Sequence, residues 1–390
     1  MPKYPSRRSF FTTAAAGAAA GGAMAVSPGT AHAQRKRYKR SSPSSPELME
    51  IGMITTGGYS HADVWAKAMN PPLEERNGDF LPRTTGMVVT MAWDPNPEYV
   101  ASFAKRFGVK TVKNFDDMVG KVDGVIISDY DVAGWLPQLT KPYLEAGMPF
   151  LIERPMALSL REANEIIERS KKYDAPIYVP SAFETRMETI RTRARLKTLI
   201  DGGARIHGVL ASQGANDYPA HGTHGIYRLH HILEPDVISV SLQTDSWWGK
   251  KSLMTWKCRQ PNGPDYFVAL QMINECRTQI FTTKGTLEEH IDLTTKEQDF
   301  YTRSKWHNYP NMYEFAKMVE TRKMPQSHDK IMSKTRTLLT GWYSHLEKGG
   351  AMVNCADLPV NWRGPDRFPG DMPKQIPRHR DPKEMDAIFG

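Results

Sequence analysis

The chain has 390 residues, of which 40% are hydrophobic, and carries a formal net charge of +8 at pH 7. This length is enough for two domains of ordinary size. The three cysteines, Cys258, Cys276 and Cys355, are widely spaced, which excludes a disulfide framework, a zinc ribbon and a haem attachment motif. Much of the positive charge lies in RKRYKR, residues 35–40, beside a Ser/Pro-rich stretch. That pattern is typical of a solvated arm, so we expect no nucleic-acid partner.

The first 33 residues show the order of features that a twin-arginine (Tat) export signal requires. Arg7 and Arg8 precede an Ala/Gly-rich apolar run, and Ala31 and Ala33 supply the small residues of a cleavage site. The run is too weakly hydrophobic for a stable membrane span. We therefore predict a signal peptide at 1–33, a basic arm at 34–48, and a periplasmic or exported protein that meets the twin-arginine translocase during export. This route carries folded proteins, which favours a bound cofactor.

Strands and helices alternate over residues 49–175. Strands are predicted at 50–56, 86–94, 123–129 and 149–155, and helices at 61–71, 97–108 and 136–147. This alternation predicts an α/β fold with a doubly wound, parallel Rossmann sheet. Residues 176–358 instead predict a second α/β domain with a large, mostly antiparallel open sheet and later helices. The last segment, 359–390, is a Pro-rich tail.

The turn after the first strand, TTGGYS, is where a Rossmann domain holds a dinucleotide pyrophosphate. The glycine fingerprint falls on Thr55, Gly57 and Ser60, with Gly58 beside them, and only the middle glycine is kept. Asp94 ends the second strand, where a carboxylate accepts hydrogen bonds from both adenosine ribose hydroxyls and repels a 2′-phosphate. We therefore predict NAD as the cofactor in preference to NADP. An Asp before PNPE is also typical of a helix cap, and that alternative stays open.

Several motifs in order resemble the Gfo/Idh/MocA oxidoreductases. They are FLIERPMALSLREANEII, AFETR, LIDGGARIHGV, TTKGTLEEHI and MYEFAKMVETRKMP, and the resemblance covers nearly all of residues 50–359. It implies a nicotinamide cofactor, a sugar or glycoside as the small-molecule substrate, and a homo-oligomer formed through the open sheet. Glu153 and Arg154 match the Glu-Lys-Pro segment beside the nicotinamide, and Arg186 of AFETR is a predicted substrate-binding residue.

Two positions depart from the family pattern. Arg154 replaces the lysine that commonly assists proton transfer, and arginine cannot act as a base near neutral pH. Trp135 and Leu136 stand where the family has a substrate-facing histidine before the last Rossmann helix. Arg154 can still hold a hydroxyl or an oxyanion. Proton abstraction must therefore move to another residue.

The histidine-rich segment DYPAHGTHGIYRLHHILEP fits the family's D-x-G-x-H-x-x-D motif in two registers. The first aligns Asp217 and His221 with the leading Asp and the His, and places His224 at the second Asp. The second aligns Gly222 and His224 with the Gly and the His, and places Tyr227 at the second acid. Asp217 and Tyr227 are predicted substrate-binding residues.

We favour the first register because YPAHG is similar to the YPTHG segment of NAD-dependent glycoside hydrolases. His221 is then the acid/base, since imidazole has a suitable pKa, and Tyr218 is a secondary proton donor. His224 lies three residues later and shares its face if the segment is helical. His230 and His231 are expected to pack or to face solvent. A zinc site at HGTH would need further ligands, so we predict no metal.

Export also constrains the reaction, because the periplasm has no free nicotinamide pool. The sequence therefore predicts an NAD-retaining oxidoreductase of sugars or glycosides that regenerates its cofactor within each turnover. An NAD-dependent glycoside hydrolase or lyase is the alternative enzyme. A non-catalytic carbohydrate-binding protein on the same fold is the alternative from another class.

Overall fold

The structure is a computed structural model that describes residues 48–55, 61–70, 86–128, 132–213, 218–244, 251–273, 275–291 and 300–365. The predicted signal peptide, nearly all of the basic arm and the tail from residue 366 lie outside the described residues. Within the described part of the chain, no helix is both long and apolar enough to cross a membrane. The three cysteines are buried and free.

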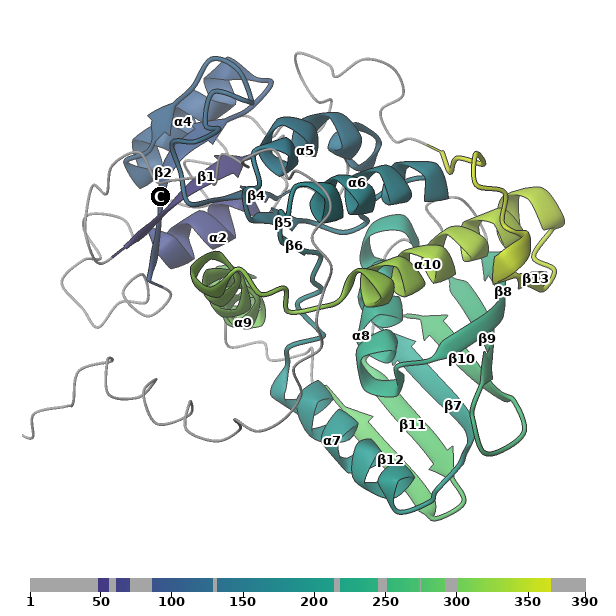
Figure 1. Ribbon diagram of the computed structural model, residues 1–390. Helices are drawn as coiled ribbons and strands as arrows, with labels where there is room; N and C mark the ends of the chain where they lie inside the picture. The colour runs from purple at the N-terminus through teal and green to yellow at the C-terminus, as the bar shows by residue number, and fades with distance from the viewer. Residues whose placement is uncertain are drawn as a thin grey trace, which may run out of the picture. The chain divides into compact units, whose positions relative to one another are not determined.

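The first domain is a parallel sheet of six strands in the order β3-β2-β1-β4-β5-β6. Figure 1 labels five of them, β2, β1, β4, β5 and β6. The strands are β1 (Met49–Ile54), β2 (Met87–Trp93), β3 (Lys110–Thr111), β4 (Gly124–Ile127), β5 (Phe150–Ile152) and β6 (Ile177–Tyr178). The helices are α2 (Ala62–Met69), α4 (Pro97–Phe107), α5 (Leu136–Glu145) and α6 (Leu160–Lys172), with a short 3-10 turn at Ala133–Trp135. The predicted doubly wound Rossmann sheet is confirmed.

Alternating side chains of the central strands fill the two faces of this sheet. Ile126 and Leu151 pack in one cluster with α2 and α4, whereas Ile127 and Ile152 pack in the other with α5 and α6. Because both faces are covered by helices, these strands are apolar on both sides rather than alternating. This explains why the short runs GVII and FLI were recognisable as buried strands.

The second domain is a sheet of seven strands in the order β12-β11-β7-β10-β9-β8-β13. Among the described strands of this sheet, only β7 and β10 pair in parallel, so the predicted mostly antiparallel sheet is confirmed. Its strands are β7 (Ile206–Gln213), β8 (Asp236–Thr244), β9 (Ser252–Arg259), β10 (Tyr266–Met272), β11 (Arg277–Thr282), β12 (Gly285–His290) and β13 (Val353–Asn354). Its helical elements are α7 (Met187–Asp201), a π-helical turn (Tyr218–Gly222), α8 (Thr223–Leu233), α10 (His328–Lys348) and a 3-10 turn (Cys355–Asp357).

Helix α9 (Phe300–Thr321) follows strand β12 of the second sheet in the chain but packs on the first sheet. Its residues Met312, Phe315 and Met318 are fully buried in the cluster that also contains α2 and α4, and Figure 1 shows α9 beside α2. The segment that the sequence assigned to the second domain therefore returns to cover the Rossmann sheet.

Candidate active site

The strand order of the first sheet places its ligand-binding crevice between β1 and β4. From β1 the chain runs outward through β2 and β3, and from β4 it runs outward in the opposite direction through β5 and β6. In open α/β sheets, ligands bind at such a switch point, outside the carboxyl ends of the strands. Thr55, Asp94, Ser128 and Glu153 all follow these strand ends.

Thr55 and Asp94 form a buried pair at the ends of β1 and β2. The Thr55 hydroxyl donates to Asp94 Oδ2 at 2.5 Å, and the backbone N–H of Asn96 donates to Asp94 Oδ1 at 2.7 Å. Asn96 itself caps α4, because its Oδ1 accepts from the Glu98 N–H at 3.0 Å. Asp94 is thus not the cap, and its buried carboxylate at the end of β2 is an acceptor of the kind that a ribose diol requires. These residues fit an NAD ribose; Gly57, Gly58 and Ser60 lie outside the described residues.

His61 lies at the start of α2 and binds the residue after β5. Its backbone N–H donates to the Ser128 carbonyl at 3.1 Å, and its Nδ1 lies 2.9 Å from Glu153 Oε2. Because an ionised carboxylate only accepts, we assign the ring proton to Nδ1. Burial, and then the positive charge of Arg154, lower the pKa of His61 to about 3. His61 is therefore neutral at physiological pH.

Arg154 joins the first domain to the second. It pairs with Glu153, and its Nη2 lies 2.6 Å from His224 Nε2 on α8. Arginine only donates, so His224 Nε2 accepts, and the ring proton lies on Nδ1, which donates to Ser181 Oγ at 2.7 Å. Burial, followed by Arg154, holds the pKa of His224 well below its usual range. The lone pair of His224 is thus occupied, which removes it as a base in this arrangement.

His221 lies at the edge of this cluster. It is half-buried on the π-helical turn, and its ring centroid is 6.3 Å from that of His224. The close packing of this segment explains its glycines, since a Cβ on Gly222 would lie 2.7 Å from Met272 Sδ. A Cβ on Gly225 would lie 2.9 Å from Gln213 Cβ. Asp217 lies outside the described residues.

The other predicted site residues are placed differently. The Arg186 guanidinium stacks over the Phe183 ring at 4.9 Å, and that ring meets His224 edge-on, so Arg186 borders the cluster. The Tyr218 hydroxyl donates to the Leu338 carbonyl at 2.8 Å in the core, which does not support its role as a proton donor. Tyr227 is fully buried, and Lys334 Nζ lies 4.1 Å from its ring centroid.

Two residues of the cluster, His61 and Ser181, were missed by the sequence reasoning. A polar network continues from Ser181, whose N–H donates to Glu184 Oε2 at 2.6 Å. Lys334 Nζ donates to Glu184 Oε1 at 3.0 Å and to the Val179 carbonyl at 2.7 Å. The only sequence signals for the missed residues were a histidine directly after the glycine turn and a serine three residues after the end of β6.

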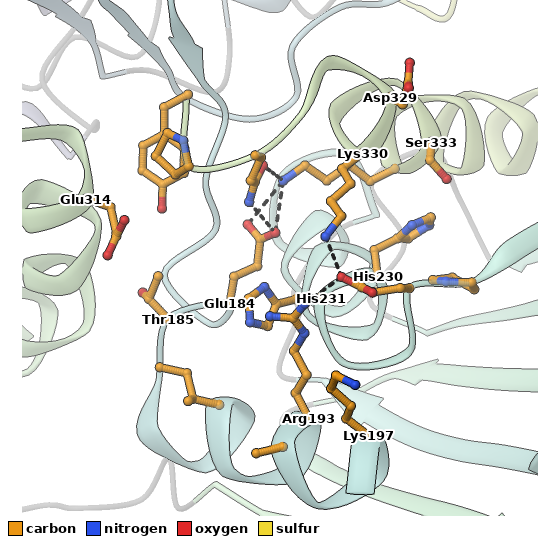
Figure 2. Close-up of a pocket in the computed structure, with 18 residues that line it drawn as sticks. Glu184, Thr185, Arg193, Lys197, His230, His231, Glu314, Asp329, Lys330 and Ser333 are labelled. Atoms are coloured by element: carbon orange, nitrogen blue, oxygen red, sulfur yellow. Dashed lines mark hydrogen bonds and ion pairs between the residues drawn. The ribbon is translucent and has the colours of Figure 1, made fainter. Parts of the chain in front are cut away.

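A separate cleft of about 870 Å³ lies between α7, α8 and α10 (Figure 2). Its lining includes Glu184, Lys334, Arg193, Lys330 and Glu234, whereas Arg154 and His224 do not line it. Five of its charged side chains are paired with one another: Lys334 with Glu184, and both Arg193 and Lys330 with Glu234. The candidate active site is therefore the Arg154 cluster. Among the described residues, no group of three or more His, Cys, Asp or Glu could hold a metal ion.

Residues 49–180 match the model of the Gfo/Idh/MocA family, described as an oxidoreductase family with an NAD-binding Rossmann fold. A comparison with curated protein sequences found no match. On this match over residues 49–180, the predicted enzyme class, an NAD(P)-dependent oxidoreductase, and the predicted NAD cofactor are confirmed.

Solved structures with the same fold include three inositol dehydrogenases. Myo-inositol dehydrogenase from Lactobacillus casei, in complex with NAD(H) and myo-inositol, has a TM-score of 0.63 and 15% identity over 82% of this chain and 99% of that chain. Scyllo-inositol dehydrogenase from the same organism, with NAD(H) and scyllo-inositol, has a TM-score of 0.60 and 14% identity over 80% of this chain and 100% of that chain. Myo-inositol 2-dehydrogenase from Lactobacillus plantarum has a TM-score of 0.62 and 14% identity over 79% and 99%. At these identities the likeness shows the fold.

Proposed function

We propose that the protein is an exported oxidoreductase of sugars, cyclic polyols or glycosides that keeps its NAD bound and regenerates it within each turnover. The observation that carries this proposal is the contact between Arg154, directly after β5, and His224 of the second domain. It brings the segment that lies beside the nicotinamide in related folds against the histidine-rich helix. The inositol dehydrogenases of the same fold support a polyhydroxylated ring as the substrate class.

In this proposal, each residue of the Arg154 cluster has a separate role in the reaction. NAD supplies a hydride acceptor when bound, with Thr55 and Asp94 holding its ribose. The Arg154 guanidinium holds the oxygen of the reacting carbinol and stabilises the negative charge that develops there, since it stays protonated. His221, half-buried at the edge of the cluster, contacts the sugar and serves as an acid/base. Arg186 stacks on Phe183 beside His224, where it reaches a substrate hydroxyl or carboxylate.

The first experiment is to denature the purified protein and quantify released nicotinamide nucleotide by mass spectrometry. We expect close to one NAD per chain, and Asp94→Ala should lower that content because the ribose loses its acceptor. Asn114→Ala, at an exposed position, is the control. An empty wild-type protein that also fails to bind added NAD would refute the proposal and favour the non-catalytic carbohydrate-binding protein.

We infer a second candidate, an NAD-dependent glycoside hydrolase or lyase, from the YPAHG segment. In this reaction, oxidation at C3 of the sugar acidifies the C2 proton, elimination breaks the glycosidic bond, and the hydride returns after water adds. This reaction requires a second acid/base group, because protons are removed both from the carbinol oxygen and from C2. The position of His221 beside the Arg154 cluster therefore favours the hydrolase or lyase. Incubation of the holoenzyme with 4-nitrophenyl glycosides distinguishes the two: nitrophenol release without net NADH formation identifies the hydrolase.

We also propose that the second sheet forms a homo-oligomer through its outer face. Leu210, Leu253 and Phe267 lie on neighbouring strands and are 53%, 44% and 51% exposed. Large side chains clustered on one sheet face are typical of a protein interface. Light scattering on the wild type and on Phe267→Glu tests this; a monomeric wild type would contradict it.

We propose export by the twin-arginine route from the order of charge, apolar run and cleavage site in residues 1–33. Replacement of Arg7 and Arg8 by lysine should keep the protein in the cytoplasm. Cell fractionation of the two versions measures this, and equal export of both would reject the signal.

A further inference from the structure

His61 occupies the crevice at the switch point of the Rossmann sheet. Its backbone N–H donates to the carbonyl of Ser128, which lies at the carboxyl end of β4. In sequence, His61 is six residues after Thr55, the residue that follows β1. The ring lies 5.4 Å from that of Trp65, one helical turn further along α2, and Trp65 is buried. The imidazole is thus fixed by its own helix in the crevice where ligands bind in this kind of fold.

The orientation of the His61 ring leaves one nitrogen directed away from its partner. Glu153 receives the Nδ1–H, and Nε2 therefore carries the lone pair, with no partner among the residues that the structure describes. The His61 side chain is 22% exposed, whereas those of Glu153 and Arg154 are 3% and 2% exposed. Of the Glu153, Arg154 and His61 side chains, only that of His61 has substantial open surface.

The other basic groups of the cluster are less suited to accept a proton. Arg154 is protonated throughout the physiological range. The Nε2 lone pair of His224 accepts from Arg154, and its Nδ1–H is donated to Ser181. His61 has instead the arrangement of an effective general base, an imidazole whose far N–H is held by a buried carboxylate.

We propose that His61 is the catalytic base of the hydride-transfer step and that Glu153 is its positioning residue. The inference rests on the proposed function. The O–H bond of the carbinol breaks and its proton passes to His61 Nε2, while the carbinol C–H bond breaks and its hydride passes to NAD⁺. The products are a carbonyl, NADH and an imidazolium. In the return half of the cycle, the imidazolium of His61 would give the proton back to the carbonyl oxygen as the hydride returned from the bound cofactor to the carbonyl carbon.

The electrostatics of the site agree with this order of events. Burial, and then the charge of Arg154, keep His61 neutral, so it is a weak base in the resting protein. The hydroxyl proton becomes more acidic as the hydride leaves, so a weak base can accept it while Arg154 stabilises the charge that develops on the oxygen. The carboxylate of Glu153 then stabilises the imidazolium across the 2.9 Å contact. His221 keeps its acid/base role for a second proton transfer, at another position of the substrate or at its leaving group.

The first arm of the test uses no substrate. Side-chain ¹⁵N–¹H correlation spectra of the histidine-labelled holoprotein at pH 7 should show a neutral, Nδ1-protonated ring that disappears in His61→Asn. Free histidine prefers the opposite tautomer, so Glu153→Ala should shift this ring toward Nε2–H. A charged or Nε2-protonated His61 in the wild type would overturn the inference even if NAD is bound.

The second arm measures the hydride step by single-turnover absorbance at 340 nm, with myo-inositol, D-glucose and methyl glucosides as probes. His61→Asn keeps an N–H for Glu153 but has no basic nitrogen. We expect it to slow NAD reduction about 100-fold or more with unchanged NAD content, and imidazole to rescue His61→Ala. The exposed His207→Asn is the control. Undiminished reduction in His61→Asn would overturn the inference alone, whereas no reduction in the wild type would overturn the proposed function and the inference with it.

Discussion

His230 provides a quantitative test of the buried histidines in the second domain. Its Nε2 lies 3.0 Å from Thr337 Oγ1, its ring lies 5.3 Å from that of Trp256, and burial lowers its pKa from 6.5 to about 3. His230 therefore takes up a proton near pH 6.5 in the unfolded chain but only near pH 3 in the folded chain. The neutral ring's contribution to the free energy of unfolding is present at high pH and is lost as the pH falls. At pH 5, the difference of 1.5 units corresponds to about 2 kcal/mol of lost stability from this residue alone.

The assay is urea unfolding of the wild type and of His230→Gln at pH 7 and pH 5. Glutamine keeps a donor for Thr337, whose own hydroxyl proton is given to the Ser333 carbonyl at 3.0 Å. The variant should lose about 2 kcal/mol less than the wild type between the two pH values, because it cannot take up the proton. His207→Gln, at an exposed position on β7, is the matched control and should keep the wild-type pH dependence. Equal losses in the wild type and His230→Gln would show that His230 titrates normally in the fold.

Two further predictions concern packing around the same helices. Lys334→Met leaves the Glu184 carboxylate buried without its ion-pair partner and should destabilise the protein by about 3–5 kcal/mol at pH 7. Part of this loss should be recovered at acid pH, because Glu184 then takes up a proton. Urea titrations that show no loss of stability would contradict the pairing. Gly225→Ala would place a Cβ 2.9 Å from Gln213 Cβ and 3.0 Å from Leu270 Cδ2, and a cost of about 1–3 kcal/mol in unfolding free energy is expected from this overpacking. A neutral effect would mean that α8 lies farther from the sheet.

Most of the fold was predictable because its signals are local. The strands GVII and FLI and the helix capped by Asn96 and closed by Gly108 are short patterns whose residues interact with near neighbours. The position of α9 was not predictable in this way. Its buried face, with Met312 and Phe315, is apolar. The same apolar pattern would suit a helix that covers the second sheet and one that covers the first. Periodicity shows that a helix has a buried side, but not which surface that side meets.

The same distinction applies to the site. Glu153 and Arg154 were found because they stand together in one motif, and the histidine segment was found because its residues are close in sequence. His61 was missed because its partner Glu153 is 92 residues away, and Ser181 because its partner His224 is 43 residues away. Neither histidine nor serine is distinctive alone at the start of a helix or after a strand. Only the folded sheet shows that the residues after β1 and β5 meet over the end of β4.

The replacement of lysine by Arg154 and the position of His61 can be understood together. A lysine has a single terminal nitrogen, whereas Arg154 uses one nitrogen for Glu153 and another for His224, and so binds the two domains while remaining charged. A permanently charged residue stabilises an oxyanion but cannot remove a proton. An imidazole held by the same Glu153 carboxylate supplies that missing capacity. Loss of the lysine therefore does not by itself argue against redox chemistry, because the two functions of one residue can be divided between Arg154 and His61.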